Sequence, residues 1–264
     1  MAYDFDGSNN LNGFDSLDIS SVDEAAWSLW YKAGATDPTT RQALFSKQET
    51  ATRQRGWNIE IAGDVAGDPF AVTLIGTEGS NEVRVEFPRP NDTDWHHVLV
   101  TYDGSQAASG VKLWRDGVER TGTTIDDTLT SNLHQSAGVN IAARNNNDLK
   151  FSGQIAEVAM WSTTGTLGIG GAEASMLALG LSPLFLTGYI DDLQMYQALI
   201  RDLDWPGVGP SFTASGGPTV SAHLRVIYPT TAISNAKETP AGGPQVGGGY
   251  GVKGTGLLSP VGII

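Results

Sequence analysis

Cysteine is absent from this 264-residue chain, and long apolar runs are absent as well. Without cysteine there are no disulfide bonds, so folding does not depend on an oxidising compartment. No apolar stretch approaches the roughly 18 residues that a membrane-spanning helix requires. The N-terminus also lacks the basic and apolar regions of a signal peptide. We therefore expect a soluble protein that is made in a cytoplasm and has no membrane partner.

Positive charge is scarce too. The chain has 16 Lys and Arg residues against 29 Asp and Glu residues, which gives a formal net charge of −13. No basic run occurs anywhere in the sequence. Because a nucleic-acid surface needs clustered Lys and Arg to neutralise phosphates, this composition excludes nucleic acid as an expected partner.

Turn-forming residues are abundant, with 33 Gly and 12 Pro, and short alternating segments lie between them. Residues 95–102 and 111–116 each alternate between two faces, with Trp114 on the face opposite to Leu113. Asp116-Gly117 suits a two-residue hairpin turn, which needs positive φ at both central positions. This stretch predicts antiparallel sheet.

The same alternation predicts further strands along the chain, at residues 27–32, 44–47, 57–62, 70–75, 83–87, 139–143 and 151–161. One helix is expected before residue 190, at 171–180, because Ala, Met and Leu recur there and Gly180 is a natural stop. The pattern predicts an all-β fold, a two-sheet antiparallel jelly-roll sandwich with one short helix.

Several segments occur in a characteristic order over about residues 3–180: Asp4–Asn10, Ala26–Trp30, Leu44–Lys47, Asp94–Val98, Tyr102–Gly104, Leu113 with Asp116–Gly117, and Phe151–Val158 with Trp161. This order resembles the laminin-G-like branch of the concanavalin A-like lectin/glucanase jelly rolls, of the type found in phage-encoded structural proteins. The resemblance implies a concanavalin A-like sandwich, and it says little about the ligand because one fold hosts many functions.

The family's last strand usually carries two acidic residues before a valine. Here Ala156 stands in the first of these positions and only Glu157 remains. We therefore expect no cofactor and no metal ion. If calcium were bound, the carboxylates of Asp6, Asp103 or Glu157 would be its ligands, although each is equally a turn former.

Three regions follow from composition. Residues 1–187 form the laminin-G-like body, and residues 188–230 contain strands that complete or extend the sandwich. These strands either fill sheet positions in a circularly permuted arrangement or form an appended hairpin. Residues 231–264 are rich in Gly and Pro and cannot form a core, so we expect an extended arm.

The arm ends in apolar residues that a partner subunit would bury, each contributing on the order of 1.5–3 kcal/mol. They are Leu257, Leu258, Val261, Ile263 and Ile264. The alternative is that the arm folds back on its own sandwich.

No catalytic constellation is evident. His96 and His97 are adjacent on a strand, point to opposite faces and cannot share a metal ion. A glycosidase needs two carboxylates about 5–10 Å apart. Asp202 and Asp204 have a suitable spacing but lie among turn formers, and Asp4 and Asp6 lie at a chain end. We expect a protein that is not an enzyme.

A glycan site would combine an exposed aromatic ring with Asn and Asp side chains on loops. The candidates are Trp114, Asn145, Asn146 and Asp148. The competing interpretation is that Trp114 is a core residue, as is Trp57, and that the Asn-rich stretch is ordinary hairpin sequence.

Two functions remain. The first is a virion structural protein, specifically a bacteriophage capsid decoration or cement protein that clamps neighbouring subunits. It would be a homo-oligomer located on the virion, with the major capsid protein or other virion subunits as partners. The alternative is a carbohydrate-binding module on a phage tail or fibre that recognises host glycans.

Overall fold

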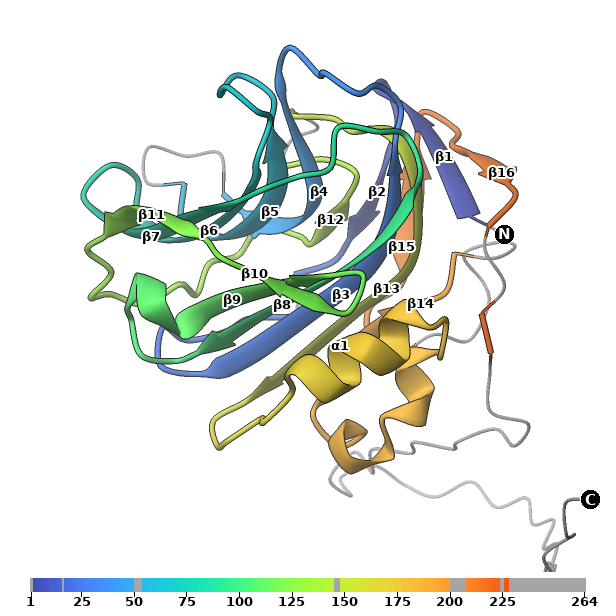
Figure 1. Cartoon of the computed structure of the whole chain (residues 1–264). Helices are drawn as coiled ribbons and strands as arrows, with labels where there is room; N and C mark the ends of the chain where they lie inside the picture. Colours follow the sequence, from blue (N-terminus) through green and yellow to red (C-terminus); the bar gives the residue numbers. More distant parts are fainter. Residues whose placement is uncertain are drawn as a thin grey trace, which may run out of the picture. The chain divides into compact units, whose positions relative to one another are not determined.

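The computed structural model describes residues 2–15, 17–49, 54–144, 148–199, 208–223 and 226–227. The chain divides into two compact units, Met1–Ile233 and Ser234–Ile264, and all described residues lie in the first. That unit is built from two antiparallel β-sheets, which confirms the predicted all-β sandwich (Figure 1). None of the described helices is long and apolar enough to cross a membrane.

Sheet A has the strand order β10-β9-β8-β3-β13-β1-β16, and β14 also pairs with β13. Its strands are β1 (Ala2–Asp6), β3 (Glu24–Ala33), β8 (Trp95–Asp103), β9 (Val111–Arg115), β10 (Val118–Arg120), β13 (Ser152–Thr163), β14 (Leu193–Gln197) and β16 (Thr219–Ser221).

Sheet B has the strand order β11-β7-β6-β5-β4-β12-β2-β15. Its strands are β2 (Asn10–Gly13), β4 (Arg41–Gln48), β5 (Gly56–Ala62), β6 (Phe70–Thr77), β7 (Asn81–Phe87), β11 (Thr123–Asp127), β12 (Asn140–Ile141) and β15 (Phe212–Ser215). The predicted strand at residues 139–143 is therefore shorter than expected.

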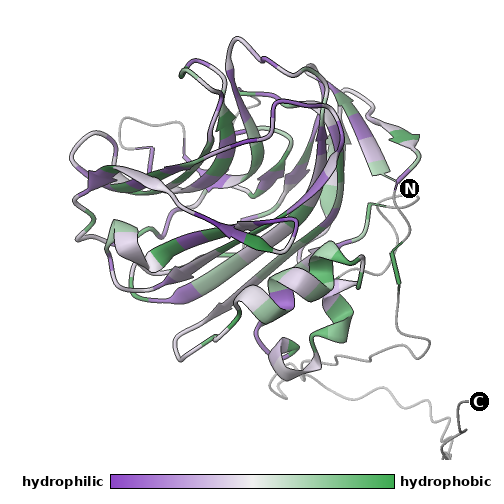
Figure 2. Cartoon of the chain, viewed as in Figure 1, coloured by the Kyte–Doolittle hydropathy of each residue, from purple (hydrophilic) through white to green (hydrophobic). Residues whose placement is uncertain are grey.

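The main core lies between the sheets, because alternate residues of each strand face the other sheet (Figure 2). Trp57 of β5 is at its centre, with ring centroids 5.4 Å from Trp27 of β3 and 4.8 Å from Phe45 of β4. Each such aromatic pair adds roughly 0.5–1.5 kcal/mol to the energy of burial.

A second apolar cluster covers the outer face of sheet A. The helix α1 (Gly171–Ala178) lies there against β8, β9 and β10 (Figure 1). It buries Ala174 and Leu177 against Leu99 and Trp161. The predicted helix at 171–180 is thus confirmed, and it covers the outer face of sheet A over β8, β9 and β10. Three short 3-10 helices also occur in the described chain, at Ala108–Gly110, Pro183–Phe185 and Thr187–Tyr189.

The C-terminal strands add to both sheets. β14 and β1 share one side of β13, since β1 pairs with residues 152–155 and β14 with residues 158–161. β16 pairs with β1, and β15 pairs with β2. These pairings join β14, β15 and β16 to the body, whereas the arm predicted at residues 231–264 lies outside the described residues.

Candidate functional site

A line of polar side chains crosses sheet B on the face opposite to the core. Directly paired residues on neighbouring strands share a face. The registers of β2, β12, β4, β5, β6 and β7 therefore align one polar residue from each strand, in the order Asn12, Asn140, Ser46, Asn58, Thr73 and Arg84. We call this line the polar row. It arises because Phe45, Trp57 and Ile59 occupy the alternate, core-facing positions.

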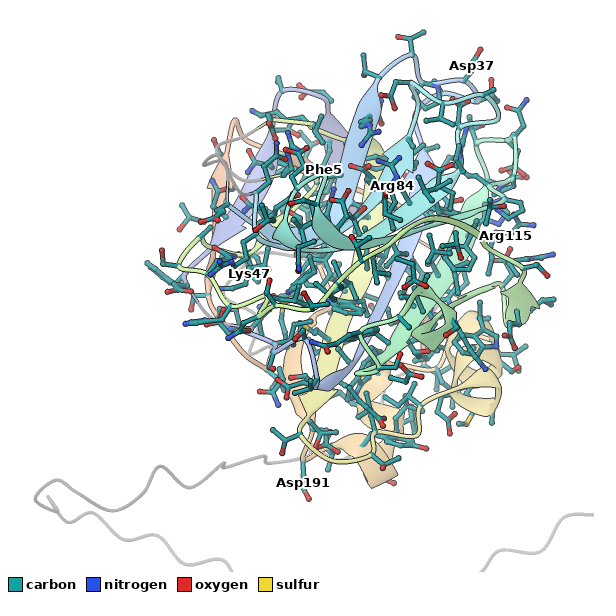
Figure 3. The ribbon with its side chains drawn as sticks, turned by 90° about the vertical axis from the view of Figure 1, so that its left-hand side faces the viewer. Phe5, Asp37, Lys47, Arg84, Arg115 and Asp191 are labelled. Atoms are coloured by element: carbon teal, nitrogen blue, oxygen red, sulfur yellow. The ribbon has the colours of Figure 1, made fainter. Side chains whose placement is uncertain are left out.

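A pocket of about 70 Å³ opens beside the centre of the polar row. It is lined by residues of β4, β5, β6 and β7 and by Arg144, and Figure 3 labels Arg84 among them. Three guanidinium groups and three carboxylates line it, from Arg41, Arg84, Arg144, Glu60, Glu78 and Glu82. Because these charges balance, the pocket is polar and has no net charge of its own. We call it the row pocket.

Each guanidinium group of the row pocket is held by a carboxylate. Arg41 lies 3.2 Å from Glu60 and 2.9 Å from Asp64. Arg84 lies 2.7 Å from Glu86. Arg144 donates two hydrogen bonds to Asp148, at 2.9 and 2.8 Å. The cations are therefore fixed in place before any ligand binds, which lowers the entropy cost of recognition.

Burial changes the acid–base behaviour of the pocket. It raises the pKa of Glu60, and the nearby Arg41 guanidinium opposes this shift. Burial likewise raises the pKa of Glu82. Asn58 Nδ2 donates a 2.7 Å hydrogen bond to Glu60 Oε2, which favours the ionised form of Glu60 and fixes the orientation of the amide.

That orientation leaves an acceptor unused. Asn58 is 3% exposed and Gln48 is 2% exposed, and both line the row pocket. No described residue donates a hydrogen bond to Asn58 Oδ1 or to Gln48 Oε1, and both atoms are buried. The Nε2 atom of Gln48 donates to Gln54 Oε1 at 3.4 Å, so the Oε1 atom of Gln48 takes no part in that hydrogen bond. Buried acceptors without donors are costly, and a ligand hydroxyl or amine would satisfy them.

Of the four glycan residues predicted from sequence, the structure describes Trp114 and Asp148, and it places them at different sheets. Trp114 is only 5% exposed, because it lies on the outer face of sheet A beneath α1, so its ring has no free face for a sugar. The competing core interpretation of Trp114 and of Trp57 fits their burial. Asp148 pairs with Arg144 at the edge of the row pocket. Asn145 and Asn146 lie outside the described residues, as do all five apolar residues predicted to contact a partner, Leu257, Leu258, Val261, Ile263 and Ile264.

His96 and His97 each contact polar side chains of neighbouring elements. His96 lies 2.7 Å from Asp116 and 2.8 Å from Asp92, and the hydrogen bond to Asp116 is the largest cause that raises the pKa of His96. His97 lies on the other face, 2.9 Å from Ser28, and burial lowers its pKa to about 3. The expectation that the two rings point to opposite faces is confirmed.

The residues considered for calcium or catalysis have separate partners. Asp6 accepts hydrogen bonds from Ser8, Asp103 accepts one from the Ser105 amide, and Glu157 accepts one from the Tyr196 hydroxyl. Across the described part of the chain, no group of three or more His, Cys, Asp or Glu side chains could hold a metal ion. The calcium alternative stays untested, and Asp202 and Asp204 lie outside the described residues.

Solved structures with this fold differ widely in sequence. A heptameric SAP-like pentraxin from Limulus polyphemus is 12% identical, with a TM-score of 0.53 over 83% of this chain and 93% of that one. A protein from Bacteroides ovatus assigned to carbohydrate binding is 14% identical, with a TM-score of 0.51 over 83% of this chain and 61% of that one. The CBM40 domain of a Ruminococcus gnavus sialidase is 14% identical, with a TM-score of 0.47 over 67% of this chain and 96% of that one.

At these identities the similarity establishes the fold alone. No match was found among curated proteins. The family model for concanavalin A-like lectin/glucanases, Laminin_G_3, matches residues 6–168. All six strands that carry the polar row lie within this range. The chain therefore belongs to the concanavalin A-like lectin/glucanases superfamily.

Proposed function

We propose that this protein is a non-enzymatic carbohydrate-binding protein and that the row pocket holds part of a glycan. One observation carries the proposal: Asn58 and Gln48 line an open pocket, and their amide oxygens are buried and accept no hydrogen bond from any described residue. Sugar hydroxyls donate to such oxygens and accept from neighbouring guanidinium groups, so the pocket offers both halves of the required hydrogen bonding.

The charge balance of the row pocket favours a neutral sugar surface. Arg41, Arg84 and Arg144 already contact carboxylates, so an anionic ligand would have to compete for them. No aromatic side chain occurs among the described residues that line the pocket. Recognition would therefore rest on directional hydrogen bonds rather than on stacking, and each bond would contribute about 1 kcal/mol net.

The name of the Bacteroides ovatus relative supports the same class of function. The capsid-decoration function depended on residues 231–264, which lie outside the described residues, so it stays a prediction. The virion location, the capsid partner and the homo-oligomeric state stay predictions with it.

The test is a glycan array followed by calorimetric titration of the glycans that bind. Asn58→Leu and Gln48→Met keep the side-chain volume and remove the unused oxygens. We expect each to weaken binding about tenfold, which corresponds to about 1.4 kcal/mol. Gln194→Met, on β14 of the other sheet, is the matched control and should bind as the unmodified protein does.

Circular dichroism and the unfolding midpoint establish that each variant is folded. Absence of binding on the array, or binding that neither Asn58→Leu nor Gln48→Met changes, would overturn the proposal.

A further inference from the structure

A second, larger pocket lies at one lateral edge of the sandwich, between β7 and β11 of sheet B and β9 and β10 of sheet A. Its volume is about 440 Å³, within the range of small-molecule sites. Val85, Phe87 and Val111 form its floor, and all three belong to the core between the sheets. These side chains are 2–5% exposed, so the pocket ends at the edge of the core between the sheets.

Arg120 is placed on the inner side of this edge. It pairs with Leu113, whose side chain is buried in the core, and paired residues share a face. The Nε atom of Arg120 is buried in the pocket wall, and no described residue accepts a hydrogen bond from it. A charged donor that is desolvated in this way needs an acceptor oxygen.

The neighbouring charges do not supply one. Lys112 and Glu119 pair with each other at 4.0 Å, and both side chains are more than half exposed. Glu119 pairs in register with Trp114, which lies on the outer face of sheet A, so Glu119 points away from the core-facing side that carries Arg120. On the inner side, Thr124 lines the pocket and pairs in register with Val85, and it carries only a neutral hydroxyl.

We propose that this edge pocket binds a small amphipathic anion, with its apolar ring or chain against Val85, Phe87 and Val111 and its carboxylate or sulfonate on Arg120. The site is separate from the row pocket, with which it shares no lining residue. Contact with the edge of the core contributes to affinity, and the charge-assisted hydrogen bond to Arg120 selects for the anion.

The probe is anilinonaphthalene sulfonate, which fluoresces when bound, and uncharged phenylnaphthylamine is its matched control. We expect saturable binding of one sulfonate probe per chain. Arg120→Gln should weaken that binding at least tenfold and leave phenylnaphthylamine binding within twofold. Arg120→Lys keeps the positive charge, so it should retain most of the affinity for the sulfonate probe. This second variant tests the proposal even if Arg120→Gln does not fold.

Lys32→Gln removes a cation that lines neither pocket, and Gln48→Met alters the row pocket. Both should bind the sulfonate probe as the unmodified protein does. Equal affinity for the sulfonate probe in Arg120→Gln, equal losses for both probes, or equal losses in Arg120→Gln and Lys32→Gln would overturn the proposal. Because no glycan is used, its failure is distinguishable from a failure of the row pocket.

Discussion

Lys47 is a buried lysine at a core-facing position of β4, paired in register with Trp57. Figure 3 labels this lysine. Its Nζ lies 2.6 Å from Asp15 and 3.1 Å from Asp18 and donates to the Ala137 carbonyl at 3.0 Å. All three ammonium protons therefore have acceptors. The two aspartates are partly exposed, so they can be rehydrated when the lysine is removed, whereas the lysine cannot be rehydrated without them.

We predict that the double variant Asp15→Ala/Asp18→Ala loses about 3 kcal/mol of unfolding free energy, because it leaves a buried cation without counter-charges. Lys47→Met keeps the apolar stem and should lose less. Urea denaturation at neutral pH measures both. Asp191→Ala, an exposed aspartate labelled in Figure 3, should change stability by less than about 0.5 kcal/mol. A larger loss for Lys47→Met than for the double variant would contradict this account.

His96 and His97 respond to pH with opposite signs. The pKa of His97 is lowered to about 3 in the folded state. As the pH falls below about 6.5, the unfolded chain therefore takes up a proton at His97, whereas the folded chain stays unprotonated there. His97 therefore reduces stability by about 2 kcal/mol between pH 7.5 and pH 5, a value set by the unfolded pKa. His97→Gln should remove that part of the pH dependence in urea unfolding. Parallel stability curves for the two proteins would rule this out.

His96 gives the opposite result. Its folded pKa is raised, chiefly by the hydrogen bond to Asp116. The stabilisation is therefore complete below the unfolded pKa and is lost as the pH rises through the folded pKa. His96→Gln should cost more stability at pH 5.5 than at pH 9, and the same unfolding series measures it.

The sequence indicated the opposite faces of these two histidines, because alternation is local. It did not indicate the burial of Lys47, since Asp15 and Asp18 lie about thirty residues earlier in the chain. Trp114 shows the same limit. Its face was predicted, but whether that face is open depends on α1, which follows more than fifty residues later. Local pattern predicts which way a side chain points, and distant elements decide whether solvent reaches it.

At the scale of elements, the hairpin turn between β9 and β10 has the predicted conformation, with φ of 53° at Asp116 and 76° at Gly117. The turn also contacts α1. A Cβ atom on Gly117 would lie 3.1 Å from the Cα of Ser175. Gly79, in the turn between β6 and β7, has a similar φ of 70°, but a Cβ atom there would meet nothing within 4 Å.

These two glycines form a matched pair. We predict that Gly79→Ala costs about 1–2 kcal/mol, which is the cost of a left-handed conformation for a residue with a Cβ atom. Gly117→Ala should cost more, because α1 must also move. Urea unfolding measures both losses. Equal losses of unfolding free energy in the two variants would contradict the prediction, because they would show that α1 moves away from the added Cβ atom at no energetic cost.

The polar row is an element-scale property that sequence alone could not assemble. Asn58 and Glu60 were visible as the polar positions of an alternating segment. Their alignment with Asn12, Asn140 and Arg84 depends on strand registers that join β2 to β12 and β4. Those pairings span up to about 130 residues of sequence, so no local motif marks the row.

At the scale of the whole unit, the placement of the C-terminal strands does not follow from local sequence pattern. Residues 188–230 contain Gly-rich turns and weak alternation, so completion of the sheets and an appended hairpin were both open. In the structure, β15 lies at one edge of sheet B and Phe212 enters the main core. β16 lies at one edge of sheet A. The edges that β1 and β2 would otherwise expose are thereby paired.

This arrangement predicts that the C-terminal strands unfold together with the body. Phe212 is 6% exposed and packs in the core that contains Trp27 and Trp57. Phe212→Ala should therefore lower the unfolding free energy of the whole unit by about 3 kcal/mol and shift a single transition followed by tryptophan fluorescence. Val220→Ala, at an exposed position of β16, should shift it by less than about 1 kcal/mol. If residues 208–221 were an independent appendage, Phe212→Ala would leave the midpoint of the tryptophan transition unchanged, and a separate early transition by circular dichroism would appear instead.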